Sequence, residues 1–214
     1  SDHTGFPEIM NGRVKTLHPL VHGGILADRD NNEHLKAMAG NNIKAIDIVI
    51  VNLYPFVDTV ASGSDFDTCI ENIDIGGPSM VRSCAKNHKH TTIVTSPTQY
   101  ATVTEEMIAN GGSTTLETRR RFALDAFAHT AEYDSHIANW FSKELEEEYP
   151  TKLFSVGTLK QVLRYGENPH QKAAVYTKTQ NSNIKQIHGK QLSYNNYNDI
   201  FSALNISKSL PKNL

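Results

Sequence analysis

E-N-I-D-I-G-G-P-S-M-V-R-S-C-A-K-N-H, from Glu71 to His88, contains a turn that leads into a helix. Gly-Gly-Pro at 76–78 forms the turn, and proline suits the first helical position because no N–H is needed there. Asp74 precedes the positive end of this helix, where free backbone N–H groups favour an anion. Arg82 and Lys86 are four residues apart, so they share one face of the helix.

Two interpretations of this stretch remain open. In the first, the carboxylate, the amide-rich turn and a lysine bind a phosphorylated, polar substrate and move its protons. In the second, the stretch is an ordinary helix N-terminus with a solvated basic face, since Gly-Gly-Pro often precedes a helix.

The composition is that of a soluble globular protein of one or two domains: 214 residues, 38% hydrophobic, 21% charged and a net charge of −2. This charge balance predicts neither a nucleic-acid partner nor a membrane partner. No apolar run approaches the ~18 residues of a spanning helix. Cys69 and Cys84 are the only cysteines, and we expect them to be reduced in a cytoplasmic protein. The chain opens at Ser1 without Met, so we expect an internal fragment of a longer protein.

Two segments are predicted to be strands of a parallel sheet. A-I-D-I-V-I-V, at 45–51, is nearly unbroken and β-branched, which favours a strand buried on both faces and covered by helices. T-T-I-V-T, at 91–95, is the second. Asn52 and Tyr54 follow the first strand directly, and ligands of open α/β sheets bind beyond the carboxyl ends of strands. The alternative for Tyr54 is a rim aromatic with a solvated hydroxyl.

Residues 1–24 are predicted to be a loop, because glycines and prolines punctuate them. G-R-V-K-T-L-H-P, at 12–19, lies within this loop. Arg13 and Lys15 are two apart, so in an extended segment they point the same way, with the Thr16 hydroxyl beside them. This pattern suits a phosphate or a carboxamide, and the alternative is a solvated basic loop.

Neither a metal site nor a nucleic-acid site is predicted. His18 and His22 have the spacing of helical metal ligands, but Pro19 lies between them and no glutamate follows His18. The arginine triplet at 119–121 is a charge run on the solvent side of a helix, and one triplet is weak evidence for nucleic acid.

Helical patterns cover much of the remainder. The expected helices span 28–40, 65–72, 78–87, 97–110, 114–149 and 199–207. The longest opens with a capping box of Thr114 and Glu117 and carries one buried stripe. The stripe consists of Phe122, Ala126, Thr130, Tyr133, Ile137 and Trp140. Only two strong strands precede Pro150, whereas a typical sheet has ~5–6, so we expect further strands upstream of Ser1.

The composition changes after Pro150. Residues 151–162 are interpreted as a linker. Residues 163–214 are too few for a core of their own and are interpreted as the start of a second domain. This segment contains L-R-Y-G-E-N-P-H-Q at 163–171 and a predicted strand at 173–177.

Taken together, the motifs resemble a bifunctional purine biosynthesis family. This family joins phosphoribosylaminoimidazolecarboxamide formyltransferase to inosine monophosphate (IMP) cyclohydrolase. The motifs, in the family's order, are G-R-V-K-T-L-H-P with H-G-G-I-L, N-L-Y-P-F, I-D-I-G-G with A-K-N-H, L-E-T-R-R, L-R-Y-G-E-N-P-H-Q and L-S-Y-N-N. Each is weak alone, but the ordered set covers nearly the whole chain.

The resemblance implies an α/β fold in two parts. Residues 1–150 would be most of the cyclohydrolase domain, an N-terminally truncated parallel sheet of the methylglyoxal-synthase-like kind. Residues 163–214 would begin a transformylase domain with a cytidine-deaminase-like α/β fold.

The resemblance also implies a set of site residues. The implied catalytic residues are Lys15, Tyr54, Asp74 and Lys86, with Lys86 as proton donor or acceptor. The implied substrate-binding residues are Arg13, Val14, Thr16, Asn52 and Ile75 in the first domain, and Arg164 and Tyr165 in the second.

The implied reaction is dehydrative ring closure of 5-formamidoimidazole-4-carboxamide ribotide (FAICAR) to IMP, without metal or cofactor. The full-length protein would also transfer a formyl group from 10-formyltetrahydrofolate to aminoimidazole carboxamide ribotide (AICAR), and would form a homodimer. We expect the chain alone to be inactive. The alternative is a methylglyoxal-synthase-like regulatory module that binds a nucleotide or phosphate without catalysis.

Overall fold

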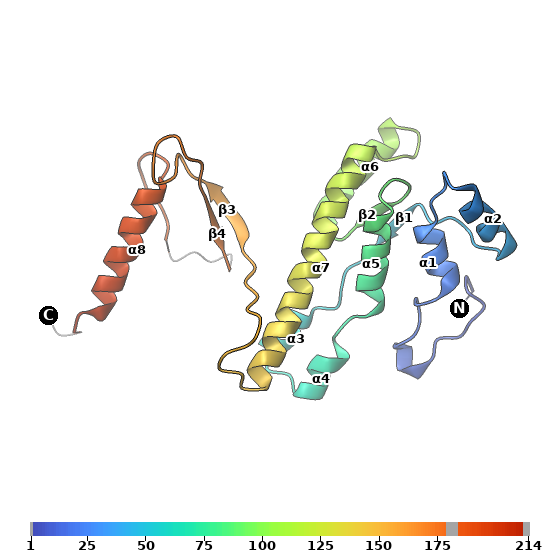
Figure 1. Cartoon of the computed structure of the whole chain (residues 1–214), viewed down its shortest axis with the longest axis horizontal. Coiled ribbons are helices and arrows are strands. Elements are labelled where there is room, and N and C mark those ends of the chain that lie inside the picture. The colour runs from blue at the N-terminus through green and yellow to red at the C-terminus, as the bar shows by residue number, and fades with distance from the viewer. Residues whose placement is uncertain (1, 179–183, 212–214) are drawn as a thin grey trace. The chain divides into compact units, whose positions relative to one another are not determined.

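The computed structural model describes residues 2–178 and 184–211. Contacts within the chain divide it into a first unit, Ser1–Thr151, and a second unit, Lys152–Leu214. The first unit has mixed α/β structure, with helices around a short parallel sheet (Figure 1).

The sheet of the first unit consists of β1 (Ile48–Ile50) and β2 (Thr92–Val94), which run parallel with Val49 opposite Ile93. This confirms the parallel pairing. Every residue of β2 is buried. The expectation that the first strand is buried on both faces is wrong at Ile50, which is 58% exposed. Ile50 is exposed because it borders the cavity described below.

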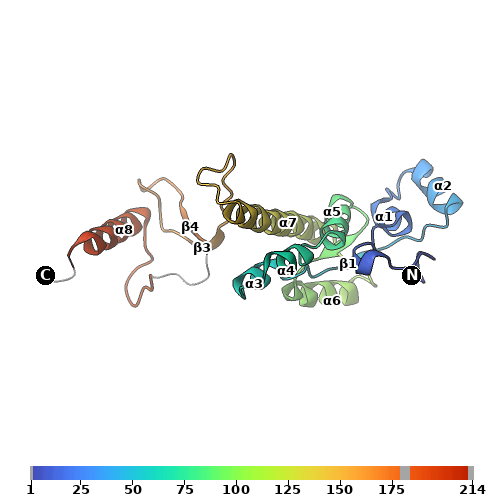
Figure 2. The ribbon, with the colours of Figure 1, turned by 90° about the horizontal axis from the view of Figure 1, so that it is seen from below.

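Helices make up most of the first unit. They are α1 (Pro19–Leu26), α2 (Asn32–Gly40), α3 (Phe56–Ala61), α4 (Phe66–Glu71), α5 (Gly76–Lys86), α6 (Tyr100–Ala109) and α7 (Leu116–Glu144), with 3₁₀ turns η1 (Met10–Gly12) and η2 (Pro97–Gln99). Figures 1 and 2 show α5 and α7 side by side. The main core lies where these two helices meet the sheet, around Val81, Ile93 and Ala126.

The long helix α7 buries the predicted stripe. Phe122, Ala126, Thr130, Tyr133 and Trp140 are all buried. The N-terminal half of the stripe packs in the main core. Tyr133 and Trp140 pack in a second, aromatic cluster with Phe56 from α3 and Cys69 from α4. One amphipathic helix therefore supports both the sheet and the short helices α3 and α4.

The ends of α7 differ from the prediction. The helix begins at Leu116, and Thr115 caps it by accepting the N–H of Thr118. Thr114 is not the cap because its hydroxyl is buried in a 2.8 Å hydrogen bond with Thr92 of β2. The helix ends at Glu144, before a left-handed residue, Glu146, at φ 53°.

Helix α1 contradicts the prediction of a loop over 1–24. Pro19 is its first residue, and the His18 ring accepts the N–H of Leu20 at 3.1 Å as a cap. Gly24 in its last turn is buried, and a Cβ there would lie closer than 3.0 Å to the Lys44 carbonyl oxygen. Glycine at this position allows close packing rather than a turn.

The starts of α2, α4 and α6 can also be compared with the predicted helix ranges. The predicted helix 97–110 opens with a capping box of Ser96 and Gln99, and its first turn is the 3₁₀ turn η2. The helix predicted over 65–72 is α4, with Asp65 as its N-cap and Asn72 as its C-cap. Helix α2 begins only at Asn32, because Asn31 is the cap and Asp28 belongs to the preceding turn.

The second unit contains an antiparallel pair and a helix. β3 (Thr158–Val162) pairs with β4 (Ala174–Thr177), and α8 (Tyr194–Ser209) follows a capping box of Ser193 and Asn196. The predicted strand near 173–177 is confirmed. The stretch 151–162, interpreted as a linker, includes all of β3. Helix α8 begins before the predicted residue 199 because Ser193 caps it.

Both cysteines are buried and free, which confirms that they do not pair. Burial raises the pKa of the Cys84 thiol to about 11, although hydrogen bonds with Thr91 and Val49 oppose the shift. In the part of the chain that the structure describes, none of the helices combines the length and apolarity needed to cross a bilayer.

Burial predicts that the thiols of the folded chain are unreactive. At pH 8 we expect little reaction of native protein with a thiol-specific disulfide reagent, and two reacting thiols per chain in denaturant, because the thiolate is the reactive form. A Cys69→Ser variant assigns the signal to each cysteine. Rapid native reaction of Cys84 would contradict the burial described here.

Candidate active site

A cavity of about 840 Å³ opens in the first unit, where the segment after β1 meets the N-terminus of α5. This volume falls in the range of ~300–1,000 Å³ that is typical of small-molecule sites. Polar groups on its wall come from three segments that are distant in sequence. They are Glu8, Arg13, Lys15 and Thr16; Asn52 and Tyr54; and Glu71, Asp74, Gly76 and Gly77.

The carboxylate of Asp74 joins two segments of the cavity wall by hydrogen bonds. Its Oδ1 accepts the N–H of Gly77 at 2.7 Å, so it caps α5, and its Oδ2 accepts the N–H of Tyr54 at 3.4 Å. A Cβ on Gly77 would lie closer than 3.0 Å to this carboxylate. The glycine therefore allows the cap. The helix starts at Gly76, before the predicted first residue Pro78. Ile75 occupies the N-cap position, and Asp74, one residue earlier, supplies the carboxylate that accepts an N–H of the first turn.

The glycine before it serves the neighbouring segment. A Cβ on Gly76 would lie 2.6 Å from the Thr16 hydroxyl oxygen, so glycine lets Thr16 approach the N-terminus of α5. An antiparallel bridge between Ile9 and Val14 holds the chain just before Thr16. Together these contacts place one hydroxyl and the positive end of a helix on the same side of the cavity, an arrangement that favours an anion.

Both cations of the cavity are paired with carboxylates. Arg13 forms an ion pair with Glu71, and Lys15 Nζ lies 2.9 Å from Glu8 Oε2. The hydrogen bond and charge of Glu8 raise the pKa of Lys15, with a smaller contribution from Tyr54. Glu71 raises the pKa of Arg13 in the same way. Both cations are therefore charged at neutral pH, and both are exposed enough to exchange partners with an anionic ligand.

Sequence reasoning missed Glu8 and Glu71. One signal was available for Glu8, because Asn-Gly at 11–12 is typical of a tight turn between two extended segments. Asn11 and Gly12 both have positive φ, at 53° and 89°, and this turn brings the residues before Ile9 back beside those after Val14. For Glu71 there was no local signal, since it lies 58 residues from Arg13.

Most of the implied first-domain residues lie in this cavity. Those on its wall are Arg13, Lys15, Thr16, Asn52, Tyr54, Asp74 and Ile75. Val14 is half-buried and takes part in the backbone bridge instead.

The structure does not place Lys86 where the resemblance implied. Lys86 is the exposed last residue of α5, whereas the cavity lies at the helix N-terminus, Gly76. With a rise of ~1.5 Å per residue, ten residues separate these positions by roughly 15 Å. Lys86 shares one face of α5 with Arg82, and both residues are exposed to solvent.

Arg164 and Tyr165 belong to the second unit. The guanidinium carbon of Arg164 lies 4.9 Å from the centre of the Tyr165 ring. Backbone hydrogen bonds join this pair to the L-S-Y-N-N motif: Arg164 N–H to Leu192 at 3.3 Å, and Tyr194 N–H to Tyr165 at 3.2 Å. Two motifs of the second unit are therefore adjacent, with an exposed guanidinium beside them.

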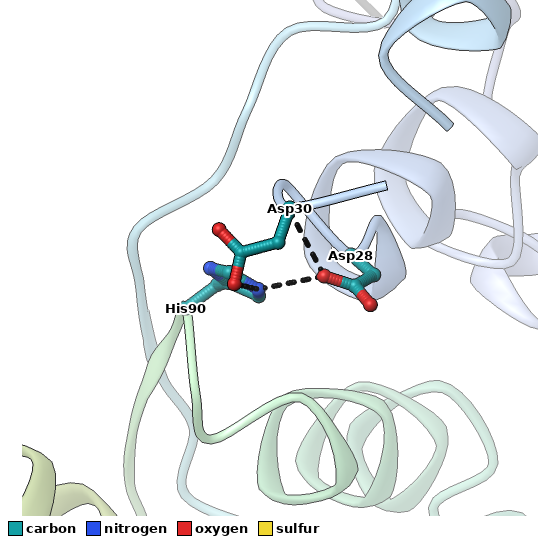
Figure 3. Close-up of side chains that lie close together, drawn as sticks. All are labelled: Asp28, Asp30 and His90. Atoms are coloured by element: carbon teal, nitrogen blue, oxygen red, sulfur yellow. Dashed lines mark hydrogen bonds and ion pairs between the residues drawn. The ribbon is translucent and has the colours of Figure 1, made fainter. Parts of the chain in front are cut away.

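Figure 3 shows a cluster of Asp28, Asp30 and His90, whose possible metal-donor atoms lie within 4.8 Å of one another. Asp28 Oδ1 lies 3.0 Å from His90 Nε2 and accepts the N–H of Asp30 at 3.0 Å. The ammonium of Lys89 pairs with Asp30. Because these groups already satisfy one another, we interpret the cluster as a link between the α1–α2 turn and the turn before β2.

Two family models match this chain. A family model described as AICARFT/IMPCHase bienzyme matches residues 84–213, and a model described as MGS-like domain matches residues 1–79. The chain belongs to the AICARFT/IMPCHase bienzyme family. It combines an MGS-like domain with a segment of the bienzyme, in a mixed α/β fold with a parallel sheet.

The chain is similar to proteins named bifunctional purine biosynthesis protein PurH. That of Rhodospirillum rubrum is 52% identical over 210 residues, covering 96% of this chain and 40% of the relative. That of Rhizobium leguminosarum bv. trifolii is 52% identical over 217 residues, covering 99% and 40%. The chain thus spans about 40% of the length of these curated relatives.

A solved structure titled "Crystal structure of ForH" is also similar. It superposes with a TM-score of 0.57 and 35% identity, covering 66% of this chain and 72% of that chain. The bienzyme match begins within α5 and continues past residue 151, so it crosses the boundary between the two units.

The cap on α5 can be tested by filling its space. We expect Gly77→Ala to lower the free energy of unfolding by about 1–3 kcal/mol, because the new methyl overpacks against Asp74. Gly40→Ala is the matched control, since a Cβ there meets nothing within 4 Å. Urea unfolding gives the free energy of unfolding of both variants and of the unsubstituted chain. A Gly77→Ala variant as stable as the unsubstituted chain would contradict the close approach of Asp74.

The cluster of Figure 3 predicts an acid-sensitive contact. The pKa of Asp28 is lowered by the N–H of Asp30 first and by His90 second. Its stabilising contribution is therefore present above the ordinary pKa of 3.8 and is lost as pH falls through the lower folded value. We expect Asp28→Asn to reduce the difference in urea midpoint between pH 6 and about pH 3. The exposed Asp134→Asn on α7 is the control, and equal effects would contradict the link.

Proposed function

We propose that the protein acts in de novo purine biosynthesis and that the cavity of the first unit closes the ring of FAICAR to give IMP. The observation that carries this proposal is the convergence of Lys15, Tyr54 and Asp74 in one cavity, in a chain that belongs to the AICARFT/IMPCHase bienzyme family. Residues 1–150 form the cyclohydrolase domain in this proposal.

The reaction sets the demands on the site. The carboxamide nitrogen attacks the formyl carbon and a C–N bond forms. The formyl oxygen then leaves as water, which takes up one proton from the carboxamide nitrogen and one from the formamido nitrogen, and a C=N bond forms between the formyl carbon and the formamido nitrogen. An amide nitrogen is a poor nucleophile, so one proton must leave nitrogen. The formyl oxygen is a poor leaving group, so it must gain protons. No electrons are exchanged with another compound, and the products are IMP and water.

The cavity residues meet these demands from different sides. Lys15 and Tyr54 stabilise the oxyanion that develops on the formyl oxygen, and the charged Lys15 is also a proton donor. Asp74, held by its two backbone N–H bonds, orients the carboxamide. Lys86 has no role in this mechanism, because it lies at the far end of α5.

The remaining polar groups bind the nucleotide. Arg13 and Thr16 hold the phosphate next to the N-terminus of α5, and Arg13 exchanges its bond to Glu71 for one to the ligand. Asn52 and Ile75 line the heterocycle. This division follows from charge, since the cations and the helix terminus suit the anionic end of the substrate.

The second activity belongs to the full-length protein. We propose that residues 163–214 begin a transformylase domain that transfers the formyl group of 10-formyltetrahydrofolate to AICAR. Arg164 contacts this substrate, because its guanidinium is exposed beside Tyr165. In this proposal the full-length protein is a homodimer.

A regulatory module is the second candidate function. Its support is the MGS-like match to residues 1–79 and the absence of Lys86 from the cavity wall. A module of this kind would bind the nucleotide through the same cations but would show no turnover.

Two substitutions separate these functions. Both are made in a chain extended to the length of its relatives. We expect Lys15→Ala to lower kcat for ring closure about 10²–10³-fold and Tyr54→Phe to lower it about tenfold or more. Each substitution removes a hydrogen-bond donor to the transition state. Ring closure is followed by ultraviolet absorbance, and formyl transfer by the same protein is the internal control.

Lys36→Ala is the matched surface control, because Lys36 lies outside the cavity and pairs with Glu33 on α2. IMP binding to each variant is measured by calorimetry. Binding without ring closure in the unsubstituted extended chain would support the regulatory module. Equal loss of ring closure and formyl transfer in Lys15→Ala would contradict a separate cyclohydrolase site.

A further inference from the structure

We propose that Tyr133 of α7 is a positioning residue that fixes Asp74 for ring closure; this inference rests on the proposed function. Its hydroxyl accepts the N–H of Asp74 at 2.9 Å and donates to the carbonyl oxygen of Asn72 at 3.2 Å. One side chain thereby binds both ends of the three-residue segment 72–74 that joins α4 to the cap of α5.

The segment that Tyr133 holds is also part of the cavity wall. Ile73 and Asp74 line the cavity, and Asn72 is the C-cap of α4. The carboxylate of Asp74 is engaged with Gly77 and Tyr54, while its backbone N–H is engaged with Tyr133. The side chain and the backbone N–H of the same residue are therefore held by different partners.

The Tyr133 ring is itself held rigidly. It is 7% exposed and packs in the aromatic cluster, with its centroid 6.4 Å from that of Phe56 in an edge-on arrangement. Trp140 continues the cluster, 5.5 Å from Phe56. A buried ring on a long helix is a firmer support than a loop side chain, because its rotamer is set by packing. The hydroxyl stays protonated at neutral pH, since burial raises its pKa.

The role of the hydroxyl is geometric. Tyr133 does not line the cavity, so it does not touch a ligand there. Without the hydroxyl, the N–H of Asp74 and the carbonyl of Asn72 lose a shared partner, and the segment 72–74 is free to shift. A displacement of about 1 Å at a reacting group costs on the order of a hundredfold in rate, although the binding cations Arg13 and Lys15 are unaffected.

The test is Tyr133→Phe, which removes the hydroxyl and keeps the ring. In the chain extended to the length of its relatives, we expect kcat for ring closure to fall about ten- to a hundredfold. KM for FAICAR should change less than about threefold, and formyl transfer by the same protein should be unchanged. Hydrogen exchange at the amides of Asp74 and Gly77, measured by NMR in the 214-residue chain, should become faster.

Thr130→Val is the matched control. It removes another buried hydroxyl from α7, whose bond goes to Phe127 within the same helix. We expect a similar loss of stability in urea, with kcat and the exchange of Asp74 unchanged. An equal fall in kcat in both variants would show that Tyr133 acts only through general stability and would overturn the proposal.

Two further outcomes distinguish a failure of the positioning role from a failure of the proposed function. Unchanged kcat and unchanged exchange at Asp74 in Tyr133→Phe would overturn the positioning role, while the proposed function stands. Absence of ring closure in the unsubstituted extended chain would overturn the proposed function and, with it, the catalytic part of this inference. The exchange of the Asp74 amide would still decide whether Tyr133 fixes that residue.

Discussion

The hydrogen bond from the Gly77 N–H to the Asp74 carboxylate is the contact on which the cavity depends. It starts α5, and the same carboxylate receives the N–H of Tyr54, so the segment after β1 is held against the helix terminus. Glycine at 76 then admits Thr16. One capped helix end thus gathers three segments that are far apart in sequence, and its free N–H groups give their meeting point a positive potential.

Each of the two cations of the cavity already has a carboxylate partner before any ligand binds. Arg13 forms an ion pair with Glu71 and Lys15 forms one with Glu8, and all four side chains are exposed. Exposed ion pairs contribute little to stability and are screened by salt. The pairs therefore orient the cations and keep them charged, but they oppose the entry of a phosphate only weakly. A buried pairing would have made the same exchange costly.

Helix α7 gives the cavity its support. Its first half packs against the sheet and α5, and its second half packs in the aromatic cluster with α3 and α4. Tyr133 lies in that second half and reaches the backbone of Asp74. The stripe of α7 was predicted from its periodicity, but the hydroxyl of Tyr133 appeared there only as one more core residue. A side chain that packs as part of the core thereby also supports the site.

The amino-acid sequence by itself determined the parallel strands, the stripe of α7 and the polar residues that follow β1. These features depend on periodicity and on neighbours within a few residues. Only the tertiary structure decided that Glu71 pairs with Arg13, that Tyr133 holds Asp74, and that Lys86 lies away from the cavity. The first two contacts join residues 58 and 59 positions apart. Such contacts arise when helices pack, because packing brings together side chains whose spacing along the chain carries no local signal.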